Sequence, residues 1–289
     1  MKNFKGKTAV ITGGASGIGL ALANAAADRQ MNVVLADIQE DALKTAVEHF
    51  ESRQTQVLGV VTDTSVKESI QNLFEEATNR FGNIHLLFNN AGVVNGGAPV
   101  PVWELPEQDW NWVMGVNFYG VLYGVQTFAP HMVGHGEEGH IVNTASIASF
   151  IPGSYPYGIS KYSVIILSEA LAFDLEASSG NIGASVVCPG WVNTNIGDAE
   201  RNRPDAFKSA ANPAGAGLGI NELLAGSKSP EDLAAHVFES VEQDRFYIFP
   251  HSGWDYLVTE HAEAMVKREG PHRFDIQAHI ATRAEGKDI

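Results

Sequence analysis

The stretch Thr12-Gly13-Gly14-Ala15-Ser16-Gly17-Ile18-Gly19 lies between the apolar residues 7–11 and the alanine-rich residues 20–27. The first flank is typical of a buried parallel strand, and the second consists of strong helix formers. Glycines in such a turn permit a tight reversal of the chain and a close approach of the backbone to a ligand. Because the N-terminus of a helix attracts anions, the stretch predicts a site for the pyrophosphate of a dinucleotide.

A second apolar stretch, residues 33–37, ends in Asp37, eighteen positions after Gly19. In a dinucleotide-binding unit, a carboxylate at about this distance accepts hydrogen bonds from the adenosine ribose. An ordinary strand-to-helix turn would explain the glycines alone, but not the acidic residue at this spacing. The two features together favour dinucleotide binding.

The composition limits the classes of protein that fit. The 289 residues suffice for one α/β domain, and the net charge of −15 disfavours a nucleic-acid partner. Cys188 is the only cysteine, which excludes an intrachain disulfide and fits a reducing compartment. We find no apolar signal segment in residues 1–7 and no apolar stretch near the roughly 20 residues that span a bilayer. We therefore expect a cytoplasmic protein without a membrane partner.

Strand and helix patterns alternate along the chain, which predicts an α/β fold with a doubly wound parallel sheet of the Rossmann type. Further strands are predicted at residues 56–61, 84–88, 140–144, 184–187 and 246–249. Residues 1–289 are expected to form a single domain. Two segments stand apart from its core: residues 195–228, which show little periodicity, and the C-terminal extension 251–289, which contains a helix pattern at 254–268.

More motifs follow in order as far as Thr194. They are Asp63 after Val61-Thr62, Asn89-Asn90-Ala91-Gly92, Asn117, Ser146, Tyr157-Gly158-Ile159-Ser160-Lys161, and Pro189-Gly190 followed by Thr194. With these motifs and the glycine-rich turn, the sequence resembles the short-chain dehydrogenase/reductase family in its single-domain branch. The resemblance implies hydride transfer between a nicotinamide dinucleotide and an alcohol or ketone. It also implies that residues 195–228 form a flap over the substrate.

The resemblance assigns residues to the cofactor. They are Gly13, Ser16, Gly17, Ile18, Gly19, Asp37, Asp63, Asn90, Ala91, Gly92, Tyr157, Lys161, Pro189, Gly190 and Thr194. Asp37, with Glu40 and Asp41 close by, would repel the 2′-phosphate of NADP, so NAD is the expected cofactor.

Tyr157 and Lys161 are four positions apart on a predicted helix, so both side chains emerge on one face. Lowering the pKa of a phenol by about three units requires roughly 4 kcal/mol. A cation about 4 Å away, at an effective dielectric constant near 20, supplies an amount of that order. Lys161 and the positive nicotinamide ring are therefore expected to make Tyr157 a proton donor or acceptor.

The resemblance gives Ser146 a hydrogen bond to the substrate oxygen, Asn117 a water that relays protons to Lys161, and Thr194 the carboxamide. Taken singly, Asn117 would fit a polar helix position, Ser146 a strand-end cap and Thr194 a turn. In one departure from the family, Ser146 precedes Tyr157 by eleven residues rather than the more usual thirteen or so. Tyr155 is a rival to Tyr157, but it would point off the helix face that Lys161 occupies. We expect Tyr155 and Trp191 to line the substrate pocket.

Structural roles explain two other groups of residues. His131 and His135 have metal-ligand spacing, but Gly134 and Gly136 mark a helix end, so no metal is expected. Three further tryptophans are expected in the core or an interface. They are Trp103, Trp110 and Trp112.

Residues 93–97, 147–156 and 191–196, which are expected to line the pocket, contain no Lys or Arg. The sequence thus favours a neutral, apolar or aromatic secondary alcohol or ketone, with Arg201 and Arg203 of the flap as possible partners of an anionic substrate. The flap sequence is also similar to that of bacterial dehydrogenases which oxidise benzylic alcohols in lignin-derived aryl ethers. A catalytically idle dinucleotide sensor on the same fold is the alternative. Residues 110–131 and 157–178 are expected to pair in a homodimer or, as second choice, a tetramer.

Overall fold

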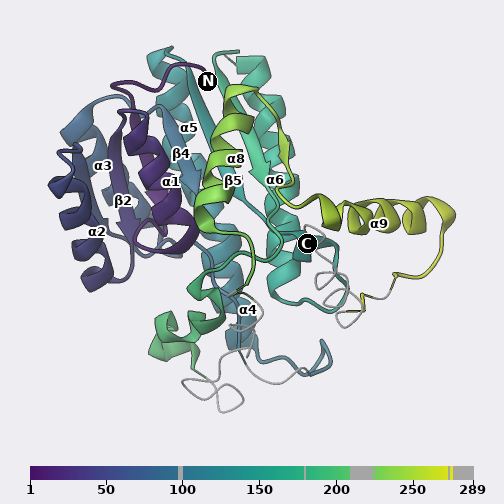
Figure 1. The fold of residues 1–289 in the computed structure, drawn as a ribbon. Helices are drawn as coiled ribbons and strands as arrows, with labels where there is room; N and C mark the ends of the chain where they lie inside the picture. The colour runs from purple at the N-terminus through teal and green to yellow at the C-terminus, as the bar shows by residue number, and fades with distance from the viewer. Residues whose placement is uncertain (97–99, 179, 209–223, 225, 273, 276–289) are drawn as a thin grey trace.

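The computed structural model describes residues 1–96, 100–178, 180–208, 224, 226–272 and 274–275 (Figure 1). Within this part of the chain, seven strands form one parallel sheet in the order β3-β2-β1-β4-β5-β6-β7. The strands are β1 Thr8–Thr12, β2 Asn32–Asp37, β3 Val57–Val61, β4 Leu86–Asn89, β5 Gly139–Thr144, β6 Ile182–Val187 and β7 Tyr247–Ile248. The predicted doubly wound α/β fold is confirmed.

Helices cover both faces of this sheet, because alternate strand residues point to opposite sides. Ala9 and Ile11 of β1 pack with α1, α2 and α8, whereas Val10 packs with α3, α5 and α6. The helices are α1 Gly17–Asp28, α2 Glu40–Ser52, α3 Lys67–Phe81, α4 Glu107–Met114, α5 Gly120–His135, α6 Tyr157–Ser178, α8 Pro230–Glu242 and α9 Asp255–Lys267. Figure 1 shows α9 extending away from the sheet.

Two helix ends show the capping that their sequences indicate, whereas one predicted helix is interrupted. Ser229 caps α8 by accepting a hydrogen bond from the backbone of Asp232 at 3.0 Å, and Gly136 ends α5 in the left-handed conformation at φ 72°. The exception is the predicted helix 110–131. It is interrupted by a π-helical turn, η1, at Gly115–Tyr119, which separates α4 from α5. π-helical turns are rare in proteins overall, and those that occur are often found at functional sites.

The segment proposed as a flap is described only in part. Residues 195–208 contain two short 3₁₀ helices, η3 Asn195–Asn202 and η4 Asp205–Phe207. Residues 209–223 and 225 lie outside the described part, as do the last residues of the C-terminal extension, 276–289. No helix in the described residues is long and apolar enough to cross a membrane.

Candidate active site

A cavity of about 370 Å³ opens at the carboxyl edge of the sheet, where the loops after β1, β2, β4, β5 and β6 meet. Ligands bind at this edge in open α/β sheets because the strand order reverses there. Most residues singled out from the sequence line it. They are Gly13, Ser16, Gly17, Ile18, Asp37, Asp63, Asn90, Ala91, Gly92, Ser146, Tyr157, Lys161, Pro189, Gly190, Trp191 and Thr194.

The glycine-rich turn requires glycine for reasons visible in its contacts. Gly13 has φ +64°, and a Cβ there would lie 3.0 Å from the Cα of Ala91. Gly19 does not line the cavity. A Cβ on Gly19 would lie 1.9 Å from the carbonyl oxygen of Gly13, so this glycine lets α1 pack closely on the turn.

Thr12 and Asp37 hold the loops around this turn in place. The Thr12 hydroxyl accepts hydrogen bonds from the backbone N–H groups of Asn90 at 2.9 Å and Ala91 at 3.1 Å, which ties the end of β1 to the end of β4. The two Asp37 carboxylate oxygens accept hydrogen bonds from the backbone of Ala15 at 3.1 Å and Gln39 at 3.0 Å. Each oxygen keeps a lone pair for a ribose hydroxyl.

Lys161 lies buried behind Tyr157. Its ammonium nitrogen donates a hydrogen bond to the Thr144 carbonyl at 2.8 Å and lies 5.8 Å from the centre of the Tyr157 ring. Burial lowers the pKa of Lys161 to about 8. Within the chain, burial also raises the pKa of Tyr157, and the hydrogen bond with Ser146 opposes that rise. The lowering of the Tyr157 pKa expected from the Lys161 spacing is therefore not produced by the protein alone.

Ser146 combines the two roles that the sequence left open. Its hydroxyl caps the 3₁₀ helix η2, Ile147–Phe150, by accepting a hydrogen bond from the backbone of Ala148 at 3.1 Å. The same hydroxyl contacts the Pro189 carbonyl at 3.4 Å and hydrogen-bonds Tyr157. This side chain therefore belongs to both the local turn and the cavity.

Asn117 is placed differently from the other predicted catalytic residues. Its side chain is fully buried in the π-helical turn and does not line the cavity. The amide exchanges hydrogen bonds with the backbone of Val93, at 2.8 Å and 2.9 Å, and donates another to the Ser160 hydroxyl at 3.0 Å. Both amide hydrogens of Asn117 are thus used to hold the Val93 loop beside Lys161.

Of the two residues predicted for the substrate pocket, Trp191 lines the cavity and Tyr155 does not. The Tyr155 hydroxyl donates a hydrogen bond to the Val100 carbonyl instead. Trp191 packs edge to face against Trp254, with ring centroids 5.3 Å apart. Thr194 also faces the cavity, beside Gly17.

The sequence did not predict that several other residues line the cavity. Trp112 belongs to a small core cluster and also lines the cavity, as does Trp254 at the base of α9. Neither follows a motif, so no local signal placed them there. The other apolar residues that line the cavity include Val93, Val94, Val116, Ile147, Ile151, Val192, Ile196, Ala199 and Leu224.

The two flap arginines have different surroundings. Arg203 is buried, pairs with Asp109 at 2.7 Å and Glu200 at 2.6 Å, and lies 4.0 Å from the Trp112 ring centre. The Arg203 guanidinium is therefore paired with carboxylates of the protein. The role in binding an anionic substrate, which the sequence left open for Arg203, does not fit this pairing. Arg201 lines the cavity and donates to the carbonyls of Asn195 and Asp198 at 2.9 Å and 2.8 Å.

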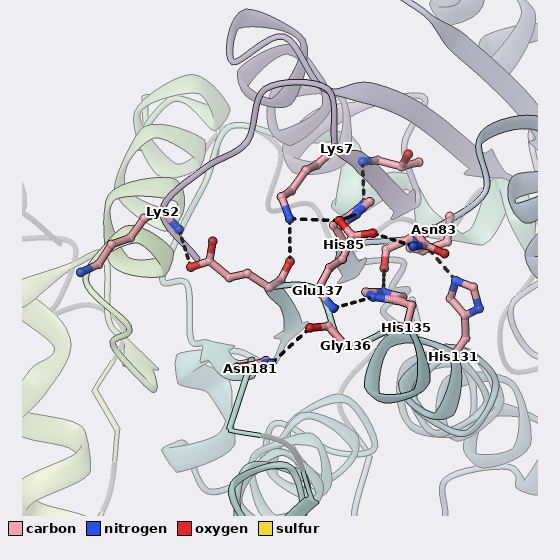
Figure 2. Close-up of polar contacts among 12 residues, drawn as sticks. Lys2, Lys7, Asn83, His85, His131, His135, Gly136, Glu137 and Asn181 are labelled. Carbon is pink, nitrogen blue, oxygen red and sulfur yellow. Dashed lines mark hydrogen bonds and ion pairs between the residues drawn. The ribbon is translucent and has the colours of Figure 1, made fainter.

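The histidines with metal-ligand spacing lie at the opposite, amino edge of the sheet (Figure 2). His131 accepts a hydrogen bond from the Ile84 backbone at 3.3 Å, and His135 donates one to the Ile84 carbonyl at 2.9 Å. In the described part of the chain, no group of His, Cys, Asp and Glu is arranged to hold a metal ion. These histidines serve the hydrogen bonding of strand ends.

Comparison with known proteins agrees with this geometry. A family model described as "short chain dehydrogenase" matches residues 7–205. A "CLA biosynthesis dehydrogenase/reductase" of Lactiplantibacillus plantarum is 34% identical over 280 residues, covering 94% of this chain and 97% of its own. A "C alpha-dehydrogenase" of Sphingobium sp. is 30% identical over 279 residues, covering 95% of this chain and 90% of its own.

A solved structure is similar over nearly the whole length. It is a short-chain dehydrogenase/reductase from Burkholderia phymatum in complex with NAD, with 41% identity and a TM-score of 0.89, covering 95% of this chain and 99% of the other. The chain belongs to the short-chain dehydrogenase/reductase family, whose members are oxidoreductases.

Proposed function

We propose that this protein is an NAD-dependent dehydrogenase that interconverts a neutral, apolar or aromatic secondary alcohol and the corresponding ketone. One observation carries the proposal: Ser146, Tyr157 and Lys161 line the same cavity as an apolar set of side chains. The apolar set includes Val93, Val94, Trp112, Val116, Ile147, Ile151, Trp191, Val192 and Leu224. The polar groups suit proton transfer at one oxygen atom, and the apolar wall suits the carbon skeleton around it.

NAD is the cofactor, and the residues present fit it. The positive-φ turn at Gly13 and Gly17 brings backbone groups to the N-terminus of α1, where a pyrophosphate binds. Asp37 has acceptor capacity for the ribose hydroxyls, whereas a 2′-phosphate beside it would meet a like charge. When bound, the dinucleotide supplies the acceptor or donor of the hydride.

The chain's own residues supply the proton and the geometry. Ser146 orients the alcohol or ketone oxygen, and the Tyr157 hydroxyl exchanges a proton with that oxygen. Lys161 is buried beside the phenol of Tyr157, where its positive charge stabilises the phenolate. This attraction is stronger when water is excluded from the cavity than when the cavity is open, because the effective dielectric constant is then lower. Asn117 holds the backbone of Val93, next to Gly92, which lies beside the Lys161 ammonium group.

The charges around the cavity support a neutral substrate. Among the described lining residues, the only Lys and Arg are Lys161 and Arg201. Lys161 donates to the Thr144 carbonyl, and Arg201 donates to the carbonyls of Asn195 and Asp198. A carboxylate on the substrate would therefore compete with backbone acceptors for either cation.

The alternative is a sensor that binds the dinucleotide without turnover. It is disfavoured because Ser146, Tyr157 and Lys161 share one cavity and because similar proteins are named dehydrogenases. The test measures NADH formation and consumption with a panel of secondary alcohols and ketones. We expect turnover of aryl and alicyclic members, abolished in Tyr157→Phe. Binding of NADH without turnover of any panel member would favour the sensor.

We propose a homodimer as the assembly. Ile159, Ile166 and Phe173 repeat at seven-residue intervals on α6 and are 47%, 51% and 74% exposed. Apolar side chains in such a row are typical of a helix that pairs with another chain. Light scattering at micromolar protein is expected to give a dimer mass. Phe173→Glu is expected to shift it toward the monomer.

A further inference from the structure

The loop that follows β6 forms the wall of the cavity next to Tyr157, and two different parts of the chain hold it. Ser146 contacts the Pro189 carbonyl at 3.4 Å, and the backbone of Ile147 donates to the same carbonyl at 3.0 Å. These contacts come from the catalytic side. The next two residues of the loop, Gly190 and Trp191, are held from the C-terminal extension.

His251 makes the contacts from that extension. Its Nδ1 accepts a hydrogen bond from the Gly190 N–H at 3.1 Å, and its Nε2 donates one to the Trp191 carbonyl at 3.0 Å. Because Nδ1 accepts, the proton of the neutral ring resides on Nε2, so both ring nitrogens are used in opposite senses. The side chain is 2% exposed and does not line the cavity.

The turn that begins at His251 also brings Trp254 against the loop. The backbone N–H of Trp254 donates to the His251 carbonyl at 3.1 Å, and the indole side chain of Trp254 is buried. A Cβ on Gly190 would lie 2.7 Å from Trp254 Nε1, so the indole lies directly on this glycine. Trp254 and Trp191 then meet edge to face, and both line the cavity.

We propose that His251 is a positioning residue that sets the orientation of Trp191, so that the segment His251–Trp254 selects which alcohols fit the cavity. This inference rests on the proposed function. A polar bridge to two neighbouring backbone groups fixes the path of the loop, whereas apolar packing alone would let the Trp191 ring tilt. His251 touches no reacting group, and it acts through Trp191.

The experiment compares His251→Ala with His251→Asn and His251→Gln, whose amides offer one acceptor and one donor. We expect His251→Ala to raise the KM for 1-phenylethanol roughly tenfold, with kcat and the KM for 2-propanol within about threefold. A small alcohol leaves the Trp191 wall unused. At least one amide variant is expected to restore the KM. His236→Ala on α8, away from the cavity, is the control.

A second measurement is independent of turnover. The near-ultraviolet circular dichroism of the five tryptophans includes the contribution of the Trp191–Trp254 pair. We expect the tryptophan bands to weaken in His251→Ala and to recover in an amide variant. Equal KM changes for both alcohols, amide variants no better than alanine, or an unchanged tryptophan spectrum would each overturn the proposal. If no alcohol is turned over by the wild type, the proposed function fails, while the spectra still decide whether His251 holds the Trp191 loop.

Discussion

At the carboxyl edge of the sheet, Ser146, Tyr157 and Lys161 face a cavity, whereas at the amino edge His85, His131 and His135 face the backbone and one another (Figure 2). Both groups lie at strand ends of the same sheet. The carboxyl-edge residues direct hydrogen-bond donors and acceptors toward a ligand. The amino-edge histidines form their hydrogen bonds with groups of the protein, so the amino edge contributes to stability rather than to binding.

At the amino edge, the histidine rings hydrogen-bond mainly with the backbone. Each of the three imidazoles accepts a backbone N–H through one ring nitrogen: Thr8 on His85 at 3.1 Å, Ile84 on His131 at 3.3 Å, and Glu137 on His135 at 3.0 Å. The other nitrogen of His85 contacts the Glu137 carboxylate at 3.1 Å. Polar clusters at the two edges of one sheet therefore differ in function according to whether their hydrogen bonds end within the protein.

The largest expected effect is at the carboxyl edge. Tyr157→Phe removes only a hydroxyl, so kcat is expected to fall by about 10² or more, the contribution of a positioned acid or base. The Kd for NADH, from fluorescence titration, and the unfolding midpoint in urea are expected to change little. Tyr155→Phe is the matched control. Full activity in Tyr157→Phe with loss in Tyr155→Phe would contradict the assignment.

A smaller effect is expected at the cofactor end of the same edge. Asp37→Ser with Ile38→Arg removes the repulsion of a 2′-phosphate and adds a cation. The ratio of kcat/KM for NAD to that for NADP is expected to fall by about 10², since a like-charge contact costs several kcal/mol. Glu51→Ser, at the exposed C-terminal end of α2 and outside the cavity lining, is the control. An unchanged ratio would show that Asp37 does not select the cofactor.

The amino edge is expected to respond in stability alone. His85→Ala leaves the buried Thr8 N–H without its acceptor, so the free energy of unfolding should fall by about 1–3 kcal/mol. We expect kcat/KM of the folded enzyme to stay unchanged. Urea unfolding measures the first quantity, and the exposed His49→Ala serves as control. A loss of kcat/KM without a loss of stability would break the distinction between the two edges.

The smallest expected effect is the pH dependence of stability. Burial lowers the pKa of His85 and of His131 below the ordinary value of 6.5. Groups with a lowered folded pKa stabilise the protein when neutral, and this stabilisation disappears as pH falls from 6.5 through the folded pKa. Neighbouring Glu137 stays ionised in this window, because its hydrogen bonds with Asn83 and His85 hold its pKa at about 2.

The measurement is urea unfolding at about pH 7.5 and about pH 5.5, where we expect a loss of about 1 kcal/mol or more on acidification. Buried His140, whose pKa burial lowers to about 3, contributes to this loss in all variants. Tyr157→Phe should lose as much as the wild type, because its change lies at the other edge. The variant His85→Ala should lose less. Equal losses in all three proteins would show that the histidine cluster does not set the acid sensitivity.

The parts of the site that follow from neighbours in sequence were predictable. The turn from Thr12 to Gly19 depends on φ values that glycine alone adopts easily, and Asp37 lies where the next parallel strand must end. Tyr157 and Lys161 meet because of the helical repeat. The parallel direction of the strands follows from their alternation with helices.

Only the tertiary structure decided what surrounds these residues. His251 reaches the Gly190 loop, Arg203 pairs with Asp109, and Tyr155 bonds Val100 instead of facing the cavity. Each of these contacts joins residues far apart in the chain. The repeat of a helix or a strand predicts contacts only between residues of the same element, so it does not predict these. The backbone geometry of helices, strands and turns fixes how residues close in sequence are placed, so those placements can be predicted. Which distant side chains meet is decided only by the packing of the whole chain.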